Sequence, residues 1–160
     1  MKHLLLFAGF IASCLVLPFA GDGPGISPAY AQEAFAKGRL TVVAAGGGRY
    51  PFDVEIAETF VQRAQGLQGR QRLAAGTGML FDFKKSELAV MWMKNTFVSL
   101  DMIFIAADGT IIKIARETIP KSLSIIESGG PILGVLEVPA GTTARLGIRV
   151  GDHVEHRIFQ

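Results

Sequence analysis

The sequence predicts a mainly β fold, a sandwich or partly closed barrel of about seven short strands. Two observations carry this prediction. Apolar residues gather in short runs of strand length, and glycine, which is suited to the turns between strands, occurs 19 times in 160 residues. Only one segment of the chain has apolar residues at clear helical spacing, so we expect one short helix. Many short strands with frequent turns are typical of such folds.

Two hairpins account for the best-marked strands. The first joins strands that begin at Arg39 and Phe52 through three glycines at 46–48, whose freedom at positive φ suits a tight connection. The second has apolar runs on both sides of Asp108-Gly109, a strong short-range hairpin signal. The remaining strand candidates are Met79–Phe83, Leu88–Met93, Ile132–Val138 and Val154–Phe159.

The helix is predicted from its start signal and its spacing. Thr59 followed by Gln62 forms a capping-box pattern, and apolar residues then recur at helical spacing until Gly69. A single helical turn is also expected at Thr143–Leu146, ended by Gly147.

The first 31 residues have the order of segments expected of a secretory signal peptide. A basic start at Lys2 precedes an apolar run from Leu4 to Ala20, and Ala29-Tyr30-Ala31 offers a small-residue cleavage site. We expect cleavage near Ala31 and a periplasmic or secreted protein, with a flexible segment at 32–38 and a single mostly β domain at 39–160.

Other interpretations of the leader place the protein at a membrane. The leader would act as an anchor if it were not cleaved, although its apolar run is marginal in length. Cys14 follows Ile11-Ala12-Ser13 as in a lipoprotein cleavage box, yet the apolar region continues after it. Cleavage near Ala31 would remove Cys14, the only cysteine, so stability would come from a packed core without disulfides.

Composition and motifs argue against several classes of function. The net charge is +2 and no run of lysine or arginine occurs, which gives no support for nucleic-acid binding. Phosphate loops, zinc-ligand spacing and the G-x-S-x-G pattern of serine hydrolases are all missing from the sequence. We therefore expect no cofactor and no metal, and lean away from an enzyme.

The stretch Met91–Met102 places polar residues inside one of the most apolar parts of the chain. Lys94 and Asn95 interrupt it at an expected turn, and Asp101 lies at the start of a strand with two apolar faces. Buried polar groups need partners. In one interpretation Asp101 and Asn95 only hold the backbone amides of the loop, as Asp and Asn commonly do.

In the functional interpretation these residues line a polar cleft that holds a small polar or anionic ligand or an envelope partner. The ligand-binding candidates are Lys94, Asn95, Asp101, Arg63, Arg70, Trp92 and Glu137. This interpretation makes the protein a non-catalytic binding module.

Two alternatives use parts of the same region. Asp101 and Glu137 would serve as the acid and base of a hydrolase acting on an envelope polymer, if the fold brought the two carboxylates together. Methionine thioethers are soft ligands that suit Cu(I), and the candidate ligands are Met79, Met91, Met93 and, less directly, Met102. Methionine also fills irregular gaps in apolar cores, which explains the same residues without a metal.

Four stretches in a fixed order resemble a known family. They are "VEIAETFVQRAQGLQGRQRL", "GTGMLFDF", "MWMKNTFVSLDMIFIAADGTI" and "VLEVPAGTTARLGIRVGD", from about Val54 to Asp152. The family is that of domain of unknown function 192 (DUF192), also called uncharacterised protein family UPF0127.

The resemblance implies a single compact domain, mostly β, with a barrel-like or jelly-roll-like architecture, often behind an export signal. It implies no established activity. Two positions depart from the family pattern: Ser99 stands where proline usually precedes Leu-Asp, and no aromatic residue precedes Val135-Leu136-Glu137. The first departure predicts a less rigid turn at Thr96–Leu100. The motif positions that carry over are Arg63, Gly66, Leu67, Arg70, Gly78, Met79, Phe81, Trp92, Met93, Lys94, Asn95, Thr96, Leu100, Asp101, Gly109, Glu137, Gly141, Gly151 and Asp152.

Overall fold

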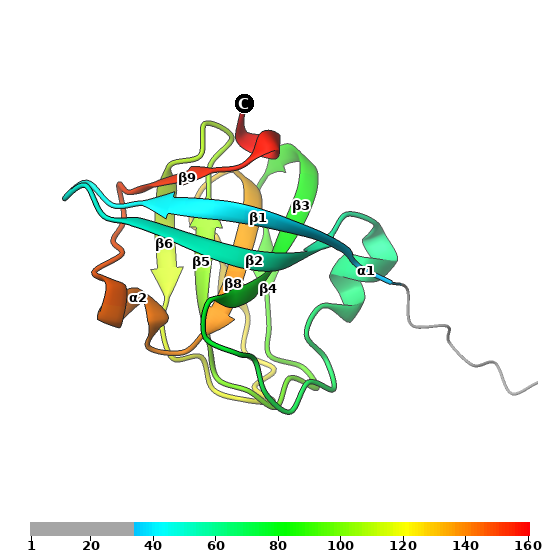
Figure 1. The fold of residues 1–160 in the computed structure, drawn as a ribbon. Coiled ribbons are helices and arrows are strands. Elements are labelled where there is room, and N and C mark those ends of the chain that lie inside the picture. The colour runs from blue at the N-terminus through cyan, green and yellow to red at the C-terminus, as the bar shows by residue number, and fades with distance from the viewer. Residues whose placement is uncertain (1–33) are drawn as a thin grey trace, which may run out of the picture. The chain divides into compact units, whose positions relative to one another are not determined.

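The computed structural model describes residues 34–160, and this part of the chain is mainly β (Figure 1). Seven strands form one sheet in the order β6-β5-β8-β3-β2-β1-β9, and two further strands, β4 and β7, pair only with each other. The elements in chain order are β1 (Ala36–Val43), β2 (Arg49–Ala57), α1 (Phe60–Gln65), β3 (Thr77–Glu87), β4 (Val90–Met91), β5 (Leu100–Ile105), β6 (Ile111–Ala115), β7 (Ile126–Glu127), β8 (Ile132–Pro139), α2 (Thr142–Leu146), β9 (His153–Glu155) and the 3₁₀ helix η1 (Arg157–Phe159).

The seven-stranded sheet curls into a nearly closed barrel, as the sequence predicts. Its two outer strands meet where Thr110, just before β6, bridges to His153 in β9. Backbone bonds from Ile111 to Asp152 and from Val154 to Gly109 extend this contact. Closing the sheet removes unpaired strand edges, which are otherwise exposed to aggregation.

The two predicted hairpins are present, and one connection requires the helix. β1 and β2 are antiparallel, and so are β5 and β6 around Gly109. β2 and β3 are parallel, so the chain must cross over between them. Helix α1 lies in this crossover, and both bonds of the Thr59–Gln62 capping box are formed.

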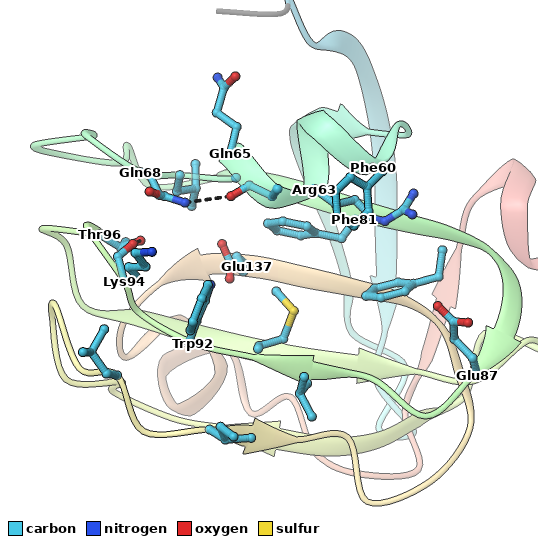
Figure 2. Close-up of a pocket in the computed structure, with 18 residues that line it drawn as sticks. Phe60, Arg63, Gln65, Gln68, Phe81, Glu87, Trp92, Lys94, Thr96 and Glu137 are labelled. Carbon is cyan, nitrogen blue, oxygen red and sulfur yellow. Dashed lines mark hydrogen bonds between the residues drawn. The ribbon is translucent and has the colours of Figure 1, made fainter. Parts of the chain in front are cut away.

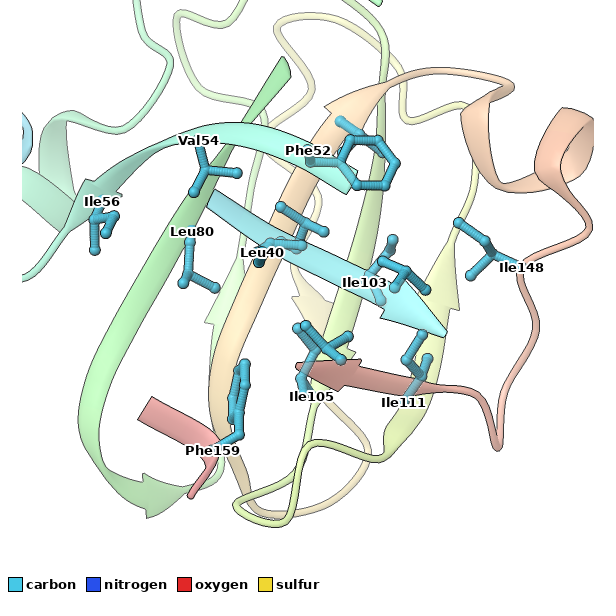
Figure 3. Packing of buried hydrophobic residues seen from close by; sticks show 14 residues of the cluster. Leu40, Phe52, Val54, Ile56, Leu80, Ile103, Ile105, Ile111, Ile148 and Phe159 are labelled. Carbon is cyan, nitrogen blue, oxygen red and sulfur yellow. The ribbon is translucent and has the colours of Figure 1, made fainter. Parts of the chain in front are cut away.

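The barrel interior holds one of two apolar clusters (Figure 3). Leu80, Ile103 and Leu136 carry it across the central strands β3, β5 and β8. Their neighbours Phe81, Phe104 and Val135 belong to a second cluster on the outer face of the same strands. The three central strands are therefore apolar on both faces, as expected for the strand that begins at Leu100.

Several boundaries differ from the predictions. β1 begins at Ala36, and residues 36–38 pair with β2 where a flexible segment was expected. The strand expected at Val154–Phe159 ends at Glu155, and η1 then turns Phe159 into the barrel core. The strand expected at Leu88–Met93 is reduced to the two residues of β4, because its only partner is the equally short β7. The helical turn expected at Thr143–Leu146, in contrast, is present as α2, and Gly147 caps its end as predicted.

The expected signal peptide at 1–31, including Cys14, lies outside the described residues. Among residues 34–160, none of the helices has the length and apolar character needed to span a membrane.

Gly78 provides a test of how closely β3 and β8 pack. A Cβ at this position would lie 2.5 Å from the backbone oxygen of Glu137, which cannot move without shifting β8. We expect Gly78→Ala to lower the free energy of unfolding by about 1–3 kcal/mol, the usual cost of overpacking. Urea denaturation measures this change. Gly46→Ala is the matched control, since a Cβ there meets nothing within 4 Å; equal effects of the two substitutions would contradict the close approach.

Candidate functional site

A cavity of about 510 Å³ lies on the outer side of the barrel (Figure 2). One wall is α1 and the loop after it, the other is β4 and the segment that includes Leu123 and Ile125, and β3 and β8 form the floor. Cavities of this size are typical of small-molecule sites.

The helical wall is fixed by Arg63. Its Nη1 donates to the backbone oxygens of Glu58 (2.8 Å) and Asp82 (2.9 Å), which ties α1 to β3. The guanidinium also lies 5.4 Å from the ring centre of Phe83. Arg63 lines the cavity, but these contacts already hold it in place. The full set of residues on this wall is Phe60, Arg63, Ala64, Gln65, Gly66, Leu67 and Gln68.

On the opposite wall, side-chain exposure alternates along the chain, although β4 ends at Met91. Met91 is partly buried and Met93 fully buried, whereas Trp92 between them is 50% exposed. Lys94 places its ammonium 5.1 Å from the Trp92 ring centre. The residues on this side are Val90, Met91, Trp92, Lys94, Thr96, Leu123 and Ile125.

The turn after Lys94 is held by polar contacts. Asn95 adopts a left-handed backbone conformation, φ 55°, and its side-chain amide donates to Gln68 (3.2 Å). Ser99, at the position where the resemblance would place proline, donates to the backbone oxygen of Thr118 (2.8 Å). The turn is thus tied to its neighbours without proline.

Glu137 stands out on the floor of the cavity. It extends from β8 between Met79 and Met102 of the neighbouring strands and points into the space between the two walls (Figure 2). Its side chain is buried, with 4% of the residue exposed, and forms no hydrogen bond or ion pair with any residue in 34–160. Burial raises the pKa of Glu137 to about 8, because the charged form loses its hydration.

Four of the seven predicted ligand-binding residues meet at this cavity: Arg63, Trp92, Lys94 and Glu137. Asn95 and Arg70 do not line it. Asn95 contacts Gln68 as described above, and Arg70 forms an ion pair with Glu55 (2.6 Å). The cavity walls are also mainly apolar, whereas the sequence suggested a polar cleft.

Asp101 does not belong to this cavity, and its prediction as a cleft residue is wrong. Its carboxylate is completely buried and accepts four hydrogen bonds, from the amides of Glu117 (2.9 Å), Gly141 (3.2 Å) and Thr143 (2.8 Å) and from the Thr143 hydroxyl (2.7 Å). The interpretation in which Asp101 holds loop backbone is therefore the one that the structure supports.

The proposed carboxylate pair of a hydrolase is not formed. Asp101 pairs in register with Val138, so Glu137 is one residue out of phase and points to the opposite face of the sheet. One carboxylate lies toward the loops at the barrel end, the other toward the cavity. The two cannot act on one substrate.

The copper hypothesis also fails on geometry. Met79, Met93 and Met102 are buried in the second apolar cluster, and the sulfur of Met93 accepts a hydrogen bond from the Thr118 hydroxyl (3.2 Å). Only Met91 lines the cavity, so no accessible pair of sulfurs is available. Across the described part of the chain, no group of three His, Cys, Asp or Glu side chains forms a metal site.

Sequence reasoning missed the apolar rim of the cavity. Phe60 is 79% exposed at the start of α1, and Leu123 and Ile125 are exposed on the far side. Alternation in the segment 122–126 was the available signal: Leu123 and Ile125 are two residues apart and share a face.

Replacing Asp101 tests its structural role. Asp101→Ala leaves three amides and one hydroxyl without an acceptor, and each buried unsatisfied group costs about 1–3 kcal/mol. We expect a loss of at least about 3 kcal/mol in the free energy of unfolding by urea denaturation. Asp53→Ala, which removes an exposed ion pair with Arg39, is the control and should change stability by less than about 1 kcal/mol. Similar values for both variants would show that the buried network is not needed.

Glu137 should make stability depend on pH. Its pKa of about 8 in the folded protein lies above the ordinary value of 4.5, so the folded state holds the proton more tightly than the unfolded state. This contribution is complete below pH 4.5 and is lost as the pH rises toward 8, at no more than about 1.4 kcal/mol per pH unit.

The measurement is urea denaturation between pH 5 and 8 for the wild type and Glu137→Gln. The amide cannot titrate, so the variant should gain stability relative to the wild type as the pH rises. A difference that does not change with pH would contradict the raised pKa.

The comparisons with known proteins agree with this fold. The model of the DUF192 family, described as an uncharacterized ACR, matches residues 41–156. The chain is similar to the crystal structure of a "putative transcription regulator" from Sinorhizobium meliloti 1021, with 46% identity, a TM-score of 0.76 and coverage of 77% of this chain and 95% of that one. It is also similar to a protein of unknown function from Novosphingobium aromaticivorans DSM 12444, with 34% identity, a TM-score of 0.74 and coverage of 91% and 94%.

No curated protein matches the chain. The family match nevertheless spans the barrel from β1 to the residue that follows β9, and it includes Arg63, Trp92, Lys94 and Glu137. The chain belongs to the DUF192 family.

Proposed function

We propose that this domain is a non-catalytic binding module, exported by its leader, whose cavity beside α1 holds a small and mainly apolar molecule. The observation that carries the proposal is Glu137, a buried residue at the floor of a mainly apolar cavity, whose carboxyl forms no hydrogen bond or ion pair with any residue in 34–160. Native proteins pair nearly all of their buried polar groups. A ligand with one polar group would supply the missing partner.

The walls support an apolar ligand body. Phe81, Met91 and Leu123 face the space from three sides of the cavity, and Phe60 and Ile125 extend the apolar surface to the rim. Large exposed apolar side chains gathered around one opening are typical of a binding site.

The lining residues favour binding over catalysis. The ionisable side chains that line the cavity are Arg63, Glu87, Lys94 and Glu137. No hydrogen bond or ion pair within residues 34–160 joins any two of them. A nucleophile needs a base within hydrogen-bond reach. Thr96 is the only lining residue with a hydroxyl group, and its hydroxyl donates to the backbone oxygen of Lys94.

Trp92 makes the proposal directly measurable, because it is the only tryptophan in the chain and lines the cavity. The probe is N-phenyl-1-naphthylamine, an uncharged apolar dye that accepts excitation energy from tryptophan. We expect saturable binding, with energy transfer from Trp92 to the dye.

Filling the cavity should block this binding. Ala64 is exposed and lines the helical wall, so Ala64→Phe adds a ring to the cavity without disturbing the core. We expect the dye to bind about tenfold more weakly or worse, since the added ring takes up the volume that the dye needs. Ala75→Phe, at an exposed position outside the cavity, is the matched control. Unchanged binding to Ala64→Phe would place the dye elsewhere and refute the proposal.

A further inference from the structure

We infer that the cavity selects small organic acids, each with an apolar body and one carboxylate, using the Glu137 carboxyl as hydrogen-bond donor and Lys94 as the opposite charge. The inference rests on the proposed binding function and adds the chemical class of the ligand. Three features of the cavity support an acid over an amine or an uncharged molecule.

The first feature is the balance of charge. Arg63 and Lys94 bring two positive charges to the lining, and Glu87 brings one negative charge. Figure 2 shows Lys94 beside Thr96 at one end of the cavity and Glu87 at the other, with Glu137 between them. The Lys94 end is therefore positive, and an anion bound there would be attracted rather than repelled.

Lys94 is also available for a ligand. Its ammonium contacts the Trp92 ring, but it forms no ion pair or hydrogen bond with another described residue. Arg63, in contrast, already donates to two backbone oxygens. Lys94 is thus the cation that can turn toward a bound carboxylate.

The second feature concerns aromatic rings. A cation that enters an aromatic pocket gains energy from the faces of the rings. Here Arg63 lies over Phe83 and Lys94 over Trp92, so cations of the protein itself already occupy these two faces. An organic amine would find only the rings of Phe60 and Phe81 free of a cation from the described residues, and it would meet the two like charges of Arg63 and Lys94.

The third feature is the protonation of Glu137. Because burial raises its pKa to about 8, the carboxyl carries its proton at neutral pH and is able to donate a hydrogen bond. A hydrogen bond from a carboxylic acid to a carboxylate is charge-assisted, and such bonds are short and strong. A ligand carboxylate therefore satisfies Glu137 better than an alcohol or an amide does.

The test compares three molecules of similar size and different charge: phenylacetate, phenylacetamide and phenethylamine. Each competes with N-phenyl-1-naphthylamine for the full-length mature protein. At pH 7 we expect phenylacetate to bind about tenfold more tightly than the amide, a difference of about 1.4 kcal/mol, and the amine to bind most weakly.

Two variants assign the selectivity to residues. Lys94→Gln should remove most of the preference for phenylacetate over phenylacetamide, while Lys85→Gln, at an exposed lysine outside the cavity, should keep it. Above pH 8, phenylacetate should bind the wild type about tenfold more weakly per pH unit, because Glu137 loses the proton it donates. Glu137→Gln keeps a donor that does not titrate, so its affinity for phenylacetate should not change between pH 7 and 9.

The outcomes separate this inference from the proposed function. Selection for acids is refuted if phenylacetamide binds as tightly as phenylacetate, or if the amine binds best. It is also refuted if none of the three molecules displaces the dye, while Ala64→Phe still blocks dye binding. In each of these cases the proposed binding cavity stands. If the dye itself binds Ala64→Phe as well as the wild type, the proposed function is refuted.

Discussion

The three central strands of the barrel must be covered on both faces, and the rest of the structure follows from this constraint. β3, β5 and β8 present Leu80, Ile103 and Leu136 to the barrel interior and Phe81, Phe104 and Val135 to the outside. Exposing the outer set to water would cost about 25 cal/mol for each Å² of apolar surface. Helix α1 and its loop cover one part of that outer face, and the short β4–β7 pair covers another. The cavity is the space that these two covers leave between them.

Two of the four buried acids, Asp101 and Glu137, show how differently the same kind of side chain is used. Asp101 and Glu137 lie on adjacent central strands, but the alternation of the strands sends them to opposite faces. Asp101 accepts four hydrogen bonds and joins the segments that begin at Glu117 and Gly141 to the barrel. Glu137 forms no hydrogen bond or ion pair within the described part of the chain and faces the cavity. Asp101 therefore serves the fold, whereas Glu137 is the residue on which the proposed ligand binding rests.

Much of the fold was predictable because its signals are local. The capping box of Thr59 and Gln62, the turn at Gly109 and the apolar runs of β3, β5 and β8 each depend on a few neighbouring residues. The errors occurred where a distant contact overrides the local pattern. The last predicted strand gives way to η1 because Phe159 is buried in the barrel core, and β4 is short because its only partner is β7.

By itself, the sequence determined the mainly β class, the family and four of the residues that meet at the cavity: Arg63, Trp92, Lys94 and Glu137. It could not separate these four from Asp101, because Asp101 and Glu137 both lie in apolar strands and their sequence contexts are similar. Only the tertiary structure decided which of the two carboxyl groups is fully hydrogen-bonded, since the donors to Asp101 come from residues 16 to 42 positions away in the sequence. It also placed α1 opposite β4, and the cavity exists only because these distant segments face each other over the sheet.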